Sequence, residues 1–110
     1  MRLEHTSAEE LKKAIRRIIA QYLPLTHYRV FFFGSRISGR GDERSDIDIG
    51  IAGDEAVPVE ILGRIREELD ELPTLYRIDV VDFAQVSSRF RDEALKHHEL
   101  VYESDAPHAL

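Results

Sequence analysis

Residues 28–51 read YRVFFFGSRISGRGDERSDIDIGI, and this stretch decides the fold. Its beginning, Tyr28–Phe33, is a short apolar run that ends at Gly34, which is typical of a buried strand. Its end, residues 46–51, alternates polar or small residues with isoleucine at a period of two, which indicates a strand with one face in the core. Residues 36–45 are rich in Gly, Ser and charge, so we predict a loop there with room for one helical turn.

The flanking segments predict three helices and two further strands. Apolar residues three and four apart predict a helix over Ser7–Tyr22, and the capping box of residues 7–10 starts it. Pro58 is well placed to open a second helix, which Pro73 stops. The elements expected after it are a strand over Tyr76–Phe83, a helix from Ser87 or Ser88 to about Lys96, and a short edge strand over residues 100–102.

This order of elements predicts a small α/β (α+β) domain, in which a mixed β-sheet carries its helices on one face. We expect a single domain over residues 1–103 and a disordered C-terminal tail over residues 104–110. A chain of 110 residues buries one modest core, so we expect no second substrate-binding domain within it.

The composition argues against several classes of function. The chain has 15 Lys and Arg against 21 Asp and Glu. The resulting formal net charge of -6 argues against a basic face that binds long nucleic acid. It has no cysteine, which removes disulfides, thiolate catalysis and Cys-ligated zinc. No apolar run approaches the roughly 20 residues that a membrane-spanning helix needs. We therefore expect a cytoplasmic protein with no membrane partner.

Two carboxylates share the polar face of the second strand. Side chains alternate along a strand, so Asp46 and Asp48 point the same way, about 6–7 Å apart, while the isoleucines between them enter the core. Like charges held this close raise each other's pKa unless a cation lies between them. Magnesium takes one or two carboxylates together with waters and substrate phosphates, so it suits this pair. The alternative is an exposed strand face with two solvated acids.

The pair Gly34-Ser35 ends the first strand, and ten residues separate it from Asp46. Glycine admits a close approach of the backbone, and a serine hydroxyl with backbone N–H groups at a helix start forms an anion site. The pattern therefore places hydrogen-bond donors for phosphate opposite a metal site. Taken alone, the pair is also compatible with an ordinary turn at the end of a strand.

The third strand supplies a third acid, which the alternation of faces selects. Ile78 and Val80 should join the core face, which puts Asp79 on the same side as the first two acids and Asp82 on the other side. We interpret Asp82 as a solvated charge at the strand edge. A shift of the strand register by one residue would exchange the two faces and make Asp82 the third carboxylate.

The run from Phe33 to Ile49, with Gly-Ser, ten residues and then Asp-x-Asp, resembles the signature of the DNA polymerase β-like nucleotidyltransferase superfamily. The short length and the Gly39-Arg40-Gly41-Asp42 loop are most similar to its minimal nucleotidyltransferase (MNT) domains. The resemblance spans roughly residues 10–103 and implies the nucleotidyltransferase fold.

The resemblance also implies a role for each motif residue. Asp46 and Asp48 would be ligands of two Mg²⁺ ions, and Asp79 would bind one metal and help to activate the attacking hydroxyl. Gly34 and Ser35 would hold the β- and γ-phosphates of ATP. Arg36, beside this pair, either neutralises triphosphate charge or is a solvated loop residue.

MNT domains are often encoded beside a HEPN-domain protein and act as its antitoxin, in known cases by AMPylation of a tyrosine. The resemblance to these MntA-type antitoxins implies a Mg²⁺-dependent transfer of AMP from ATP to a hydroxyl acceptor, with a tyrosine of a HEPN toxin as the expected acceptor. One alternative is a nucleotide-binding antitoxin module that neutralises a HEPN partner with little catalysis. Another is a small-molecule nucleotidyltransferase, in which a homo-oligomer could supply the missing wall of the acceptor site.

Overall fold

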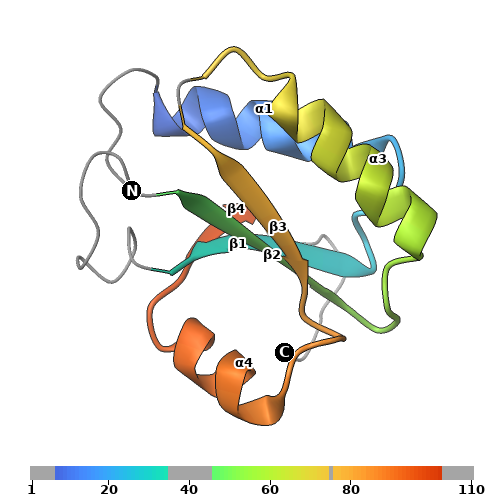
Figure 1. Cartoon of the computed structure of the whole chain (residues 1–110), viewed down its shortest axis with the longest axis vertical. Coiled ribbons are helices and arrows are strands. Elements are labelled where there is room, and N and C mark those ends of the chain that lie inside the picture. Colours follow the sequence, from blue (N-terminus) through green and yellow to red (C-terminus); the bar gives the residue numbers. More distant parts are fainter. Residues whose placement is uncertain (1–6, 35–45, 75, 103–110) are drawn as a thin grey trace.

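The computed structural model describes residues 7–34, 46–74 and 76–102. These residues form a four-stranded mixed sheet in the order β3-β2-β1-β4, together with three helices (Figure 1). The predicted loop over residues 36–45 and the predicted tail over residues 104–110 lie outside the described residues. The elements are α1 (Ala8–Ala20), β1 (Tyr28–Phe33), β2 (Ile47–Gly53), α3 (Val59–Asp70), β3 (Ile78–Asp82), α4 (Ser88–Leu95) and β4 (Glu99–Tyr102).

The pairing of the strands fixes which side chains lie side by side. Strand β1 pairs antiparallel with β2 on one side and with β4 on the other. Strand β3 pairs parallel with β2, and α3 makes the crossover between them. The sheet is therefore mixed, as predicted, and the short C-terminal strand occupies one of its edges.

Helices α1 and α3 cover one face of the sheet, and the larger core lies beneath them (Figure 1). Fully buried isoleucines from both layers fill this core, among them Ile15 of α1, Ile49 of β2 and Ile65 of α3. The period of two in β2 is therefore confirmed, because Ile47, Ile49 and Ile51 all face this layer.

The expectation that all helices share one face holds for α1 and α3 and is wrong for α4, which lies on the opposite face (Figure 1). A second apolar cluster joins α4 to the sheet, with Phe31, Phe33 and Phe83 packed against Ala94 and Leu95. Gly50 lies beneath these rings, and a side chain there would collide with Phe31 and Phe83. Strand β1 is thus covered on both sides, which is the reason for its continuous apolar run.

Local sequence signals set the helix ends. The Ser7 side chain accepts a hydrogen bond from the Glu10 backbone N–H, and the Ser87 side chain accepts one from Phe90, so both serines are N-caps as predicted. Pro58 is the N-cap of α3, one position before the place expected for it. No helix within the described ranges is both long and apolar enough to span a bilayer.

Candidate active site

The register of β2 and β3 brings two of the predicted acids together. Asp48 pairs with Asp79 across the parallel ladder, and the Ile47 N–H donates to the Arg77 carbonyl oxygen at 2.9 Å, which fixes this alignment. Directly paired residues on neighbouring strands point to the same side of a sheet. Both side chains are half-buried on the face that bears α4, opposite the larger core. The prediction that Asp79 lies on the same side of the sheet as Asp48 is therefore confirmed.

Asp46, the remaining predicted acid, is exposed and lies immediately before β2. Asp46, Asp48 and Asp79 together are called the acid row below. Burial raises the pKa of the Asp48 carboxyl, and the negative charges of Asp79 and Asp46 raise it further. The carboxylates of Asp79 and Asp46 are thus close enough to disfavour the charge on Asp48. A cation placed among them would relieve this repulsion.

The acids suit a cation that keeps other oxygen ligands. Asp79 is also engaged by Arg77, whose Nε lies 3.7 Å from its Oδ1; the Arg77 side chain is well exposed, whereas that of Asp79 is half-buried. Within the described ranges, no three His, Cys, Asp or Glu side chains are arranged to hold a metal ion by themselves. Magnesium does not need such a cage, because it binds through one or two carboxylates and substrate phosphates. The oxygen donors present therefore fit Mg²⁺.

Gly34 lies directly against the Asp48 carboxylate. The residue before it, Phe33, pairs with Asp48 across the antiparallel ladder, and Gly34 has a φ of 89°, in the region that favours glycine. A Cβ atom on Gly34 would overlap the Asp48 carboxylate. The backbone and the acid therefore meet as the sequence predicts, whereas Ser35 and Arg36, the other predicted phosphate ligands, lie outside the described residues.

Asp82 has a structural role, and its interpretation as a solvated charge is wrong. Its side chain is buried on the face covered by α1 and α3, with 5% of its surface exposed. Oδ2 accepts a hydrogen bond from the Val57 N–H at 2.8 Å, and Oδ1 accepts one from the Ala84 N–H at 3.0 Å. Asp82 therefore ties the segment before α3 to the end of β3 and points away from the other acids.

Sequence reasoning missed an aromatic wall beside the acids. The rings of Phe33 and Phe83 meet edge to face at 5.1 Å between centroids, and Phe90 of α4 lies 5.9 Å from Phe33. Because Phe33 pairs directly with Asp48, this wall borders the acid row. Phe90 remains 43% exposed. The continuous aromatic run of β1 was the available signal, since it indicates that the strand has no solvent-facing side.

The sheet order, the Gly34 turn and the paired acids define a nucleotidyltransferase domain, and comparison with known proteins supports this class. Residues 13–107 match the family model described as "Polymerase beta, Nucleotidyltransferase". The chain belongs to this nucleotidyltransferase family, and the α/β fold predicted from its motif is confirmed.

One relative places the chain more narrowly within the family. It is 31% identical over 98 residues to a protein of Haemophilus influenzae described as "Probable protein adenylyltransferase MntA", a match that covers 89% of this chain and 83% of the relative. The resemblance to MntA-type proteins is therefore confirmed.

Solved structures share the fold at lower sequence identity. A toxin–antitoxin crystal structure with AMP-PNP has a TM-score of 0.68 and 17% identity, over 86% of this chain and 74% of that chain. A complex of a tri-AMPylated HEPN toxin of Shewanella oneidensis with an MNT antitoxin has a TM-score of 0.62 and 16% identity, over 88% of this chain and 73% of that chain.

Proposed function

We propose that this chain transfers AMP from ATP to a hydroxyl group in a Mg²⁺-dependent reaction, and that the acceptor is a tyrosine of a HEPN toxin that it neutralises. The observation that carries this proposal is the row of acids, in which Asp48 lies beside Asp79 and against the backbone of Gly34. The similarity to a protein adenylyltransferase supports AMP as the transferred group.

The proposed reaction is an in-line displacement at the α-phosphorus of ATP. The acceptor oxygen forms a bond to this phosphorus while the bond to the bridging oxygen of the β-phosphate breaks, and pyrophosphate leaves. Asp46, Asp48 and Asp79 would hold Mg²⁺, which when bound stabilises charge on the attacking and leaving oxygens. Asp79 is partly exposed, and in this proposal it would accept the proton of the acceptor hydroxyl.

The phosphates would lie on the β1 side of the acids. Gly34 offers its backbone without a side chain, and Ser35 and Arg36 follow it in the sequence, so the β- and γ-phosphates would bind there. On this assignment the leaving pyrophosphate and the acceptor lie on opposite sides of the α-phosphorus, as an in-line displacement requires.

A HEPN toxin is the proposed partner because two kinds of similarity point to it. The Haemophilus influenzae relative is described as a probable protein adenylyltransferase. The fold neighbours include an MNT antitoxin in complex with a HEPN toxin. We further propose that residues 1–103 act as one MNT domain and that the reaction takes place in the cytoplasm.

The test is a transfer assay with a candidate HEPN toxin as the acceptor. With ATP labelled on the α-phosphate and Mg²⁺ present, the label should appear in the HEPN protein, whereas ATP labelled on the γ-phosphate should leave no label. Mass spectrometry should then locate the added AMP on a tyrosine.

Two variants make this assay decisive. The double variant Asp46→Ala and Asp48→Ala should abolish labelling, while Asp92→Ala, which removes an exposed acid of α4, should label as the wild type does. If the double variant still neutralises the toxin fully in growth assays, neutralisation by binding alone replaces the proposal.

A further inference from the structure

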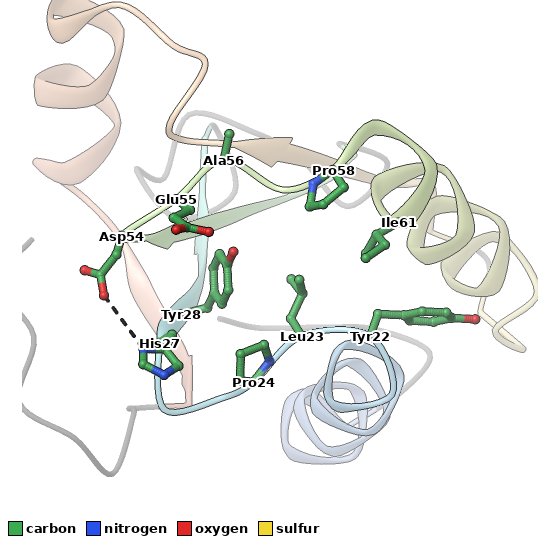
Figure 2. Close-up of a pocket in the computed structure, with 10 residues that line it drawn as sticks. All are labelled: Tyr22, Leu23, Pro24, His27, Tyr28, Asp54, Glu55, Ala56, Pro58 and Ile61. Atoms are coloured by element: carbon green, nitrogen blue, oxygen red, sulfur yellow. Dashed lines mark ion pairs between the residues drawn. The ribbon is translucent and has the colours of Figure 1, made fainter.

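A pocket of about 490 Å³ lies at the Tyr28 end of β1, and Figure 2 shows the residues that line it. The segment between α1 and β1 forms one wall, and the segment between β2 and α3 forms the other. Its main lining residues are Leu23, Pro24, Tyr28, Glu55, Pro58 and Ile61. Phe33, the partner of Asp48, lies five positions beyond Tyr28 on the strand, so the pocket is about 17 Å from the acid row along β1. It is therefore separate from the transfer site.

Tyr28 places an unpartnered hydroxyl in this pocket. The residue is 7% exposed, and its ring stands between the two walls (Figure 2). Within the described ranges, its hydroxyl makes no hydrogen bond and no ion pair. Among the described residues the one fully buried, unpaired side-chain oxygen is that of Tyr102, so the Tyr28 hydroxyl is open to the pocket and a ligand there can reach it.

The charge beside this hydroxyl is negative. Burial raises the Tyr28 pKa, and the carboxylates of Glu55, Asp82 and Asp54 raise it further, so the hydroxyl keeps its proton in a negative field. Asp54 has a partner at the rim, since His27 Nδ1 lies 3.8 Å from its Oδ2. Glu55 forms no ion pair with any described residue. The free carboxylate and the free phenol therefore favour a cation.

The rest of the lining is apolar and firmly held. Leu23 is 5% exposed, and Pro24, Pro58 and Ile61 add carbon surface around it. Val57, which lies between two lining residues, is fixed by its hydrogen bond to the buried Asp82 carboxylate. A preformed pocket of this size, mostly apolar with a few polar groups, is typical of a site for a small molecule.

From this arrangement we propose that the pocket binds a small organic amine. The ammonium group lies between the Tyr28 hydroxyl, which accepts a hydrogen bond, and the Glu55 carboxylate. The carbon skeleton of the amine packs on Leu23 and Ile61. An anionic ligand would be repelled by the exposed carboxylates of Glu55 and Asp54, so it fits the same walls less well.

The test uses phenethylamine as the probe and the full chain as the receptor, with binding followed by backbone amide shifts in NMR. Saturable shifts are expected at Leu23, Tyr28 and Ala56. The neutral isostere 2-phenylethanol should bind about tenfold more weakly, because it cannot form the charge-assisted contact. Saturable binding of the isostere with equal affinity would overturn cation recognition.

Three single variants complete the experiment. Glu55→Gln should weaken phenethylamine binding by about tenfold and Tyr28→Phe by about threefold. Tyr28→Phe removes only a hydroxyl with no partner among the described residues, so the fold should be unchanged. Glu71→Gln makes the same change of charge at the far end of α3 and should bind as the wild type does. The proposal is overturned if phenethylamine shows no saturable binding up to its solubility limit. It is also overturned if Glu55→Gln and Tyr28→Phe both bind phenethylamine as tightly as the wild type does.

Discussion

Replacing Asp82 with alanine should destabilise the fold far more than replacing Asp79 with asparagine. Asp82→Ala removes the acceptor of two backbone hydrogen bonds, from Val57 at 2.8 Å and from Ala84 at 3.0 Å. A hydrogen bond to a charged group contributes about 1.5–3 kcal/mol, and the Ala84 N–H is close enough to solvent to recover part of its loss. We therefore expect a loss of about 2–4 kcal/mol from a total of about 5–15 kcal/mol.

This loss corresponds to a fall in Tm of about 10–25 °C in a domain of this size. Asp79→Asn should move Tm by no more than about 6 °C, because it breaks one exposed ion pair with Arg77, which contributes about 0–1 kcal/mol. The same variant should lower the transfer rate by about 100-fold or more, since it removes the proposed proton acceptor.

Differential scanning calorimetry and the labelled-ATP assay measure both effects on the same samples. Asp92→Ala, an exposed acid on α4, is the matched control and should change neither quantity. The reasoning is refuted if Asp82→Ala keeps the wild-type Tm and loses transfer while Asp79→Asn remains active. That outcome would mean that β3 is shifted by one residue relative to β2.

Three further perturbations test other parts of the structure. Gly34→Ala should abolish nucleotide binding in a titration with AMP-PNP and lower Tm, because its Cβ would displace the Asp48 carboxylate and its φ of 89° disfavours alanine; unchanged affinity would contradict this. Asp48→Asn should raise the Tm of the metal-free protein, and this gain should grow as the pH rises from about 4 to 7. The wild-type Asp48 pKa is raised above its ordinary 3.8, so its contribution to stability is complete below that value and is lost as the pH rises through the folded-state pKa; a gain that shrinks with pH would have the wrong sign. Ser7→Ala should cost about 1 kcal/mol in urea unfolding, since the Ser7 side chain caps α1; no change in the unfolding midpoint would show that the cap contributes nothing.

The row of acids could be predicted from the sequence because it depends on the strand period alone. Isoleucine at 47, 49 and 51 must face the core, so the side of Asp48 follows, and the same argument applied to Ile78 and Val80 places Asp79. The prediction that Gly34 meets this row depended on β1 and β2 being neighbours, which the short connection between them favours.

Other features depend on contacts between segments far apart in the chain. Asp82 looked like a surface charge because its partner Val57 is 25 residues away, and nothing local marks that bond. The face of the sheet that α4 covers could not be predicted from the sequence for a similar reason. On that side β2 presents Asp48, Gly50 and Ala52, which look like a solvent-facing strand, although aromatic side chains from other elements fill the space above Gly50.

The position of α4 also alters the expectation about the acceptor side of the site. An open sheet face would have left the acids without any wall, whereas Phe33, Phe83 and Phe90 provide one beside Asp48. On the proposed function, the HEPN partner would complete the site from the remaining side. Exposed Phe90 lies at the border where such a partner would make contact.

The central claim is that Asp46, Asp48 and Asp79 hold the metal ions on which AMP transfer depends. The most direct measurement is a crystal structure with Mn²⁺ and AMP-PNP, with anomalous diffraction used to locate the metal. The account predicts anomalous peaks within coordination distance of these three carboxylates, with the β- and γ-phosphates against the backbone at Gly34. Nucleotide bound with its metal at Asp82, or at any site that excludes Asp48, would contradict it.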